Sequence, residues 1–218
     1  MKILIIRHGD PNYELDTLTE KGWKEAEKLA ERIAPMDIKA YYVSPMGRAQ
    51  DTVSVTLKKT GREAETLDWM HEFDAWLTDE KSGKKYLPWD MVPADFTKEE
   101  AYYKKDEWYT TALMENSDIK SRYKAVKDGL DELLKKHGYE RVNQGFKVVE
   151  GNDDTIAFYC HFGVQCVILS CLLGVSPIVF LNGLSADPTA VTTVITEDRF
   201  DGVTAFRISG FGDTSHLQ

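Results

Sequence analysis

The sequence predicts an α/β fold, a three-layer α/β/α sandwich whose mostly parallel central sheet has an antiparallel edge. Two short apolar runs, residues 3–6 and 155–160, are typical of strands buried on both faces, as in parallel sheets. Segments with helical spacing of apolar residues follow both runs. Strands at about 190–197 and 203–209, which flank the turn residues Asp201-Gly202, predict a hairpin at the sheet edge.

The elements between these strands follow from periodicity and from end signals. A helix at about 20–33 carries an apolar stripe, and Thr19 is its expected N-cap. After a strand at 40–43, Ser44 as N-cap and Pro45 at the first helical position predict the next helix. The other expected elements are a short strand at 64–68, helices at about 95–116 and 118–137, a hairpin or extended arm at 146–149 before the strand at 155–160, and a helix from there to 173.

The domain prediction is one domain over residues 1–218 with a cap insertion at about 76–152. The composition of this segment differs from that of the flanking sequence, because Trp and Tyr residues are scattered among charged residues. No linker rich in Pro, Gly or Ser separates it from the rest, so we expect a cap on the core and not an independent domain.

Composition excludes several classes of function. The net charge of −9 and the pI near 5.1 argue against a general nucleic-acid surface or a basic membrane face, so an anionic ligand needs a local cationic cluster. The N-terminus shows no secretory signal, and the longest apolar region, at about 164–175, is interrupted by polar residues. We expect a cytoplasmic protein that acts on a small molecule, without nucleic-acid or membrane partners; the sequence does not reveal its oligomeric state.

The three cysteines are expected to be reduced core thiols. Cys160, Cys166 and Cys171 lie close together in an apolar stretch and form no Cys-x-x-Cys pair. A cysteine-based phosphatase needs an Arg six positions after its nucleophile to bind phosphoryl oxygens. Those positions hold Cys166, Leu172 and Pro177, which excludes that class.

Cationic side chains follow three of the predicted strands. Arg7 and His8 end the first, Arg48 lies in the helix after the second, and His161 follows the strand at 155–160. In a parallel sheet these junctions share one edge, where ligands bind. Guanidinium groups bind phosphoryl oxygens in pairs, and a His in such a pocket can attack phosphorus. The sequence therefore predicts a phosphate site.

A leaving alkoxide needs a proton, and a carboxylic acid near the phosphate can supply it. Glu72 is the best-placed candidate, and its rivals are Asp10, Asp74 and Asp187. His8, His161, Asp10 and Glu72 are also a possible metal-ligand set, but two arginines in the same pocket repel a cation. The sequence has no His-Glu-x-x-His helix, phosphate loop or dinucleotide-binding turn.

With these motifs the chain resembles the histidine phosphatase superfamily, which has the phosphoglycerate mutase-like fold. The resemblance rests on Arg7-His8-Gly9, on Leu18-Thr19-Glu20-Lys21-Gly22, on the segment 44–52 that reads Ser-Pro-Met-Gly-Arg-Ala-Gln-Asp-Thr, on Glu72, and on His161-Phe162-Gly163. It implies that His8 is the phosphorylated nucleophile, that Arg7, Arg48 and His161 bind the phosphate, that Glu72 donates the proton, and that neither metal nor other cofactor is needed.

The sequence departs from the family pattern in two places. Asp10-Pro11-Asn12 follows the first motif, where Asn12 either contacts the phosphate or forms a turn, and Phe162-Gly163 replaces the commoner Gly-Gly. The Arg-Arg and proline-rich signature of the cofactor-dependent mutases is missing from the insertion. The resemblance therefore favours a metal-independent phosphomonoesterase that acts on a small phosphorylated metabolite. The alternatives are a phosphoglycerate mutase-type phosphotransferase and a non-catalytic phosphate-ligand binding protein.

Overall fold

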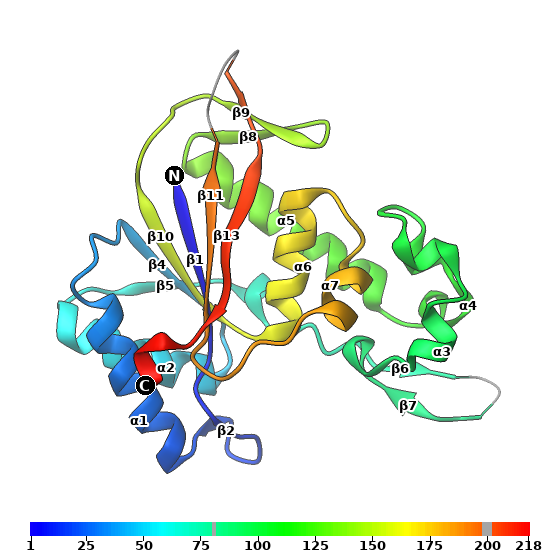
Figure 1. Ribbon diagram of the computed structural model, residues 1–218, viewed down its shortest axis with the longest axis horizontal. Coiled ribbons are helices and arrows are strands. Elements are labelled where there is room, and N and C mark those ends of the chain that lie inside the picture. Colours follow the sequence, from blue (N-terminus) through cyan, green and yellow to red (C-terminus); the bar gives the residue numbers. More distant parts are fainter. Residues whose placement is uncertain (80–81, 198–201) are drawn as a thin grey trace.

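The computed structural model describes residues 1–79, 82–197 and 202–218. Its central sheet has six strands in the order β13-β11-β1-β10-β4-β5 (Figure 1). The four strands β1, β10, β4 and β5 are parallel, whereas β11 pairs antiparallel with β1, and β13 at the edge pairs antiparallel with β11. The bounds are β1 Lys2–Arg7, β4 Ala40–Val43, β5 Ala64–Thr66, β10 Thr155–Cys160, β11 Val191–Thr196 and β13 Phe206–Asp213.

Helices cover both faces of this sheet, which confirms the predicted three-layer fold. On one face lie α1 (Glu20–Ile33) and α2 (Gly47–Thr60), and on the other lie α5 (Ile119–Lys136) and α6 (Phe162–Leu173). Strand β1 supplies both cores because side chains alternate along a strand. Ile3 and Ile5 belong to the core with α5 and α6, whereas Leu4 and Ile6 belong to the core with α1 and α2.

The segment 77–115, here called the cap segment, lies beside α7 and away from the sheet in Figure 1. It consists of short elements: β6 Leu77–Thr78, β7 Lys85–Tyr86, η2 Pro88–Asp90, α3 Pro93–Phe96, η3 Glu100–Tyr103, η4 Trp108–Thr110 and α4 Ala112–Glu115. The predicted single domain with a cap insertion at 76–152 stays a prediction. Within the described ranges, no helix has the length and apolar character needed to cross a membrane.

The predicted helix at 95–116 is wrong, because this stretch forms four separate helical turns. Its buried anchors are Tyr102, Trp108 and Met114. A six-residue spacing does not place side chains on one face of an α-helix. Breaks between the turns let all three reach the core. The helix predicted at 118–137 is confirmed as α5, with Tyr123 and Leu130 among its buried residues.

Two further predictions need correction. Helix α2 begins at Gly47 with Met46 as its N-cap, so neither Ser44 nor Pro45 has the predicted capping position. The hydroxyl of Ser44 bonds His161 instead, as described below. Of the two alternatives for the segment 146–149, the hairpin with β10 is wrong, whereas the extended chain before β10 is present as β9 (Gly145–Val148). Strand β9 lies between β8 (Tyr139–Val142) and β12 (Val203–Thr204) in a separate small sheet.

The remaining elements close the fold around the parallel strands. Helix α7 (Pro177–Gly183) and the strand β8 were not predicted, whereas the antiparallel pairing of β11 with β13 is confirmed. Of the predicted turn between them, Asp201 lies outside the described residues. A small hairpin, β2 (Pro11–Asn12) with β3 (Thr17–Leu18), follows β1. The η1 turn (Asp68–Met70) and η5 (Ser215–Leu217) complete the chain.

Candidate active site

The carboxyl ends of three neighbouring strands bring the predicted residues together. Arg7 pairs with Cys160 across β1 and β10, so His8 and His161 follow at the same level of the sheet. The backbone N–H of His8 donates to the carbonyl of Cys160 at 3.0 Å, and the N–H of Ser44 after β4 donates to Tyr159 at 2.9 Å. The rings of His8 and His161 lie 5.1 Å apart, centroid to centroid.

The side chain of His8 has the orientation of a nucleophile. Its Nδ1 bonds the carbonyl oxygen of Gly9 at 2.7 Å, so Nδ1 carries the proton and Nε2 keeps its lone pair. Burial lowers the pKa of His8 to about 4, and the charges of Arg48 and Arg7 act in the same direction. The imidazole is therefore neutral at physiological pH, as attack on phosphorus requires.

His161 is fully buried and lies beside Ser44. The Oγ of Ser44 lies 2.7 Å from Nε2 of His161 and accepts a weaker bond from the N–H of Met46 at 3.3 Å. Burial, followed by the charge of Arg48, lowers the pKa of His161 well below its ordinary value. The ring is therefore neutral. In the tautomer in which the Ser44 hydroxyl donates to Nε2, the proton of His161 lies on Nδ1.

The two guanidinium groups are held by oxygen acceptors. One terminal N–H of Arg7 donates to the carbonyl of Ala186 in the loop before β11. Arg48 is 6% exposed, and it donates to the carboxylate of Asp16 at 2.6 Å. The second Asp16 oxygen accepts the N–H of Gly47 at 2.7 Å, which fixes the hairpin loop against the start of α2. Asp16 was not among the predicted site residues.

Three buried nitrogens at this edge have no hydrogen-bond partner among the described residues. They are Nε of Arg7, Nε of Arg48 and Nδ1 of His161. Buried polar groups are rarely left unpaired, and each such group costs about 1–3 kcal/mol. The two arginine Nε atoms are hydrogen-bond donors, and Nδ1 of His161 is a donor in the tautomer in which Ser44 donates to Nε2. The chain has therefore gathered donors, two of them charged, that an anionic ligand would satisfy.

Glu72 follows β5 and η1 and lies against the start of α6. Its Oε1 accepts the N–H of Phe73 at 2.7 Å and that of Val164 at 3.0 Å, which leaves Oε2 to carry a proton. Burial raises the pKa of Glu72 above its ordinary value, although these two hydrogen bonds and the charges of Arg48 and Arg7 oppose the rise. A raised pKa is what a general acid needs.

The rival acids are placed less favourably. The Thr19 hydroxyl, which donates to Asp10 at 2.7 Å, lowers the pKa of that carboxyl, and Asp10 is therefore ionised. Asp74 accepts a bond from Arg122 at 2.9 Å, and Asp187 is exposed. The side chain of Asn12 forms a turn, because its Oδ1 accepts the N–H groups of residues 14 and 15 at 3.2 and 3.3 Å.

Two aromatic residues that the sequence analysis did not select also adjoin the site. The ring of Tyr13 lies 5.5 Å from the guanidinium carbon of Arg48. A Cβ built on Gly163 would lie 2.5 Å from Cζ3 of Trp89 and 2.7 Å from Oε1 of Glu72, so both approach the same turn of α6. Trp89 lies in η2, far from the strand ends in sequence, whereas Tyr13 lies in the loop between β2 and β3, soon after β1. No periodic pattern connects either ring to the site.

The described residues include no group of three or more His, Cys, Asp or Glu side chains arranged to hold a metal ion. All three cysteines are buried and form no disulfide. What this edge holds is a neutral imidazole with a free Nε2, two arginines, a second neutral imidazole and a carboxyl group of raised pKa. This set has the chemistry that binding of a phosphoryl group and attack by a histidine require.

Comparison with known proteins gives the family. The model of the histidine phosphatase superfamily, branch 1, matches residues 3–207, and the chain belongs to this superfamily, as the sequence predicted. A curated relative is the 2,3-bisphosphoglycerate-dependent phosphoglycerate mutase of Thermoplasma acidophilum, 36% identical over 77 residues. The matched segment covers 30% of this chain and 38% of that mutase, so the chain spans well under two thirds of the length of the mutase.

Solved structures share the fold over nearly the whole chain. A phosphoserine phosphatase of Entamoeba histolytica has a TM-score of 0.65 at 20% identity and covers 100% of this chain and 99% of its own. A mycobacterial glucosyl-3-phosphoglycerate phosphatase has the same TM-score at 14% identity, with 97% and 98% covered. A putative alpha-ribazole-5'-P phosphatase of Escherichia coli has a TM-score of 0.62 at 16% identity, with 98% of each chain covered. Family membership and this fold support the prediction of a phosphoric monoester hydrolase.

Proposed function

We propose that the chain is a metal-independent phosphomonoesterase that acts on a small phosphorylated metabolite through a phosphohistidine. The observation that carries this proposal is the set of three buried nitrogens, on Arg7, Arg48 and His161, that have no hydrogen-bond partner among the described residues, close to His8, whose Nδ1 bonds Gly9 and leaves the Nε2 lone pair for attack. A phosphoryl group has the charge and the acceptor oxygens to satisfy all three. The phosphatase names of several proteins with this fold point the same way.

In the first half-reaction, Nε2 of His8 attacks phosphorus while the bond from phosphorus to the ester oxygen breaks. The leaving alkoxide takes the proton from the carboxyl of Glu72, and the alcohol departs. The guanidinium groups of Arg7 and Arg48 and the Nδ1–H of His161 stabilise the charge on the transferring phosphoryl oxygens. Two arginines in the pocket also repel a divalent cation, which supports a mechanism without a metal.

In the second half-reaction, water releases the phosphoryl group. The Glu72 carboxylate formed in the first step takes a proton from water as the water oxygen attacks phosphorus. The bond from phosphorus to nitrogen breaks, and its electron pair returns to Nε2 of His8. The products are inorganic phosphate, a neutral imidazole and a protonated Glu72, so the site returns to its starting state.

The test is phosphoenzyme trapping with a radiolabelled aryl phosphate in the presence of a chelator. We expect turnover to survive chelation and wild-type protein to form an acid-labile, base-stable adduct that His8→Ala lacks. His216→Ala is the matched control, because His216 lies in the C-terminal turn and bonds Thr189. Labelling that persists in His8→Ala contradicts the assignment of the nucleophile, and loss of turnover on chelation contradicts the metal-free mechanism.

A second candidate is favoured by the curated mutase relative. In a phosphoglycerate mutase the phosphohistidine is kept from water and passed back to a sugar-acid substrate. Isomerisation of a phosphoglycerate in the presence of its bisphosphate, at a rate above that of phosphate release, supports the mutase. Release of phosphate with no isomerisation supports the phosphatase. Tight binding of phosphate esters without either reaction supports the third alternative, a binding protein.

A further inference from the structure

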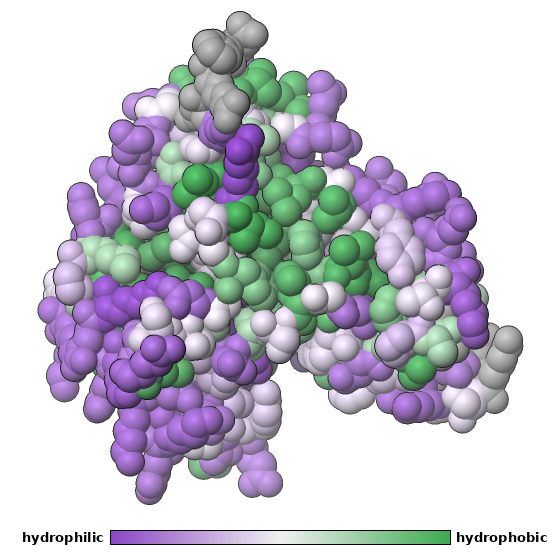
Figure 2. Space-filling view, viewed as in Figure 1, coloured by the Kyte–Doolittle hydropathy of each residue, from purple (hydrophilic) through white to green (hydrophobic). Residues whose placement is uncertain are grey.

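The proposed phosphate pocket binds only the phosphoryl group of the substrate. The surface around the pocket determines which alcohol portion can bind. Figure 2 shows the molecule hollowed between the part that bears β2 and the part that bears the cap segment. The carboxyl ends of β1 and β10, which carry the phosphate site, point toward this hollow in Figure 1. The alcohol portion of a bound ester therefore meets side chains from the β2–β3 loop and from the cap segment.

The cap segment contributes Trp89 next to Glu72. Cζ3 of Trp89 and Oε1 of Glu72 both approach Gly163, at 2.5 and 2.7 Å from the position that a Cβ there would take. The ring is half-buried, packs edge-on against Phe162 at 6.4 Å, and sits on η2, where the side chain of Asn182 donates to the carbonyl of Pro88 at 3.0 Å. Trp89 is thus fixed next to the acid that protonates the leaving group.

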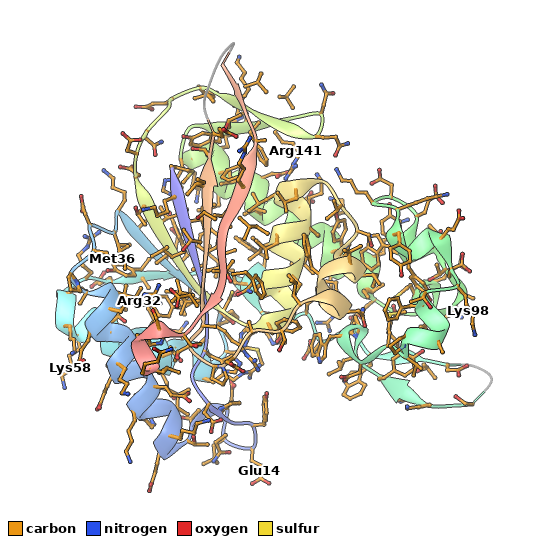
Figure 3. All side chains as sticks on the ribbon, viewed as in Figure 1. Glu14, Arg32, Met36, Lys58, Lys98 and Arg141 are labelled. Atoms are coloured by element: carbon orange, nitrogen blue, oxygen red, sulfur yellow. The ribbon has the colours of Figure 1, made fainter. Side chains whose placement is uncertain are left out.

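The β2–β3 loop presents a second aromatic ring, that of Tyr13. This ring is 69% exposed and lies over the guanidinium of Arg48, 5.5 Å from its carbon. The loop is held by the turn at Asn12 and by the two bonds of Asp16 to the start of α2. Glu14, at the tip of the loop, points away from the molecule in Figure 3. An exposed aromatic ring on a pinned loop beside the ligand site is typical of a binding surface.

The charges near the pocket disfavour a second anionic group on the substrate. Asp16 lies beside Arg48 with its side chain 43% exposed, and Asp10 is ionised. Three lysines of the cap segment are engaged or placed elsewhere: Lys104 pairs with Glu107, Lys105 donates to Gln144, and Lys98 lies at the far outer end of the cap segment in Figure 3. A carboxylate next to the phosphate ester would meet the like charge of Asp16 and Asp10.

We infer that the substrate is a phosphomonoester of an uncharged alcohol that carries a planar apolar group, which lies against Trp89 and Tyr13. This inference rests on the proposed function and narrows its substrate class. Planar apolar groups gain contact area and ring-stacking from aromatic walls, whereas a polyol or a carboxylate gains neither and loses water. Specificity would thus come from two rings that flank the phosphate pocket from separate segments of the chain.

The test compares esters of similar leaving-group reactivity. We expect kcat/KM for 2-phenylethyl phosphate to exceed that for propyl phosphate by about 10-fold or more, the range that apolar pockets achieve. Likewise, glycerol 1-phosphate should be hydrolysed faster than 3-phosphoglycerate, which adds a carboxylate. A phenyl-to-propyl ratio near unity, or a preference for 3-phosphoglycerate, would overturn the inference.

Substitutions at the two rings test whether Trp89 and Tyr13 cause the preference for the phenyl ester. Trp89→Leu and Tyr13→Leu should each lower the phenyl-to-propyl ratio several-fold while propyl phosphate is still hydrolysed. Tyr103→Leu, at an exposed aromatic residue of the cap segment, should leave the ratio unchanged. An unchanged ratio in both test variants overturns the inference alone. If wild-type protein hydrolyses no ester and forms no phosphoenzyme, the proposed function has failed, and the inference falls with it.

Discussion

At the scale of the residue, the two halves of the proposed chemistry need opposite protonation states at the same pH. His8 must be neutral to attack, and Glu72 must hold a proton to give away. Burial achieves both, because it lowers the pKa of the histidine and raises that of the carboxylic acid. The arginines add to the first effect and oppose the second, so the desolvation of Glu72 must outweigh their charges.

The role of Glu72 predicts a dependence on the leaving group. In Glu72→Gln we expect kcat for an alkyl phosphate to fall by about 100-fold or more, because its alkoxide needs a proton. 4-Nitrophenyl phosphate leaves as a stable anion, so its first half-reaction should lose far less. A rapid burst of nitrophenolate followed by slow turnover is the expected trace, since the variant also lacks the base for water. Equal losses for both esters in the first half-reaction would contradict this role.

The pH dependence follows from the same two groups. Because His8 acts when neutral, kcat/KM for the wild-type protein should fall as the pH drops through about 4. Because Glu72 acts when protonated, kcat/KM for an alkyl phosphate should fall as the pH rises through the raised pKa of Glu72. The Glu72→Gln variant, assayed with 4-nitrophenyl phosphate, should lose this basic limb in the phosphorylation step. A basic limb that persists there would assign it to another group.

How far the sequence predicts these residues depends on what positions them. Arg7, His8 and His161 end buried parallel strands, and the rule that such ends share one edge brings them together without a structure. Asp16, Trp89 and Tyr13 lie in irregular segments whose path depends on tertiary contacts, so no local pattern selects them. Asn12 has the local signature of a turn residue, and its side chain does form one.

At the scale of the element, helix α6 links Glu72, the proposed acid, to His161, which lies beside the proposed nucleophile His8. It starts right after His161, and the N–H of Val164 in its first turn donates to Glu72. The positive end of a helix stabilises a carboxylate, which explains how a buried acid is oriented without a side-chain partner. Its second residue is Gly163, where Glu72 and Trp89 come too close for a Cβ.

Gly163→Ala tests this close approach. The new methyl group would displace Trp89, Glu72 or both, so we expect kcat/KM for an alkyl phosphate to fall by about 10-fold or more. The stability cost should stay within about 1–3 kcal/mol, as for other small overpacking changes. Gly183→Ala, at the end of α7, is the control, because nothing lies within 4 Å of a Cβ there. Equal activity in the two variants would show that the turn tolerates the methyl group.

Helices and strands were predictable from the sequence where a single periodic pattern of apolar residues runs through the whole element. Buried strands and the amphipathic helices α1 and α5 follow from periodicity. The segment around Trp108 does not, because isolated aromatic anchors hold short turns there and no continuous stripe exists. Ser44 shows how one local signal can have two uses. Its hydroxyl suits a helix N-cap, but the neighbouring strand β10 brings Nε2 of His161 to 2.7 Å from the Ser44 Oγ. The bond to the ring replaces the predicted cap, and the N-cap is Met46.

At the scale of the whole molecule, the site lies between two cores, and the lowered pKa values of its histidines make the stability of the fold depend on pH. The sheet has one core on each face, and the buried imidazoles of His8 and His161 lie at the end of the strands that separate them. An unfolded histidine binds a proton below pH 6.5, whereas these two resist protonation when folded. Folding is therefore opposed by acid in this window.

This linkage predicts how acid affects unfolding. The unfolded chain binds more protons than the folded one between pH 6.5 and about 4, so the free energy of unfolding should fall as the pH drops through that range. His8 alone should account for about 3 kcal/mol of this loss.

Urea unfolding at pH 7 and pH 4.5 measures the contribution of His8. His8→Asn keeps a polar side chain but removes the titrating ring, so its stability should fall less between the two pH values than that of the wild-type protein. The difference between the two losses isolates His8 from the carboxylates, which titrate in both proteins. His216→Asn, whose ring is only partly buried, should lose nearly as much stability as the wild-type protein does. Equal losses in wild type and His8→Asn would mean that folding does not lower the pKa of His8, and the acid limb expected at about pH 4 would then be contradicted.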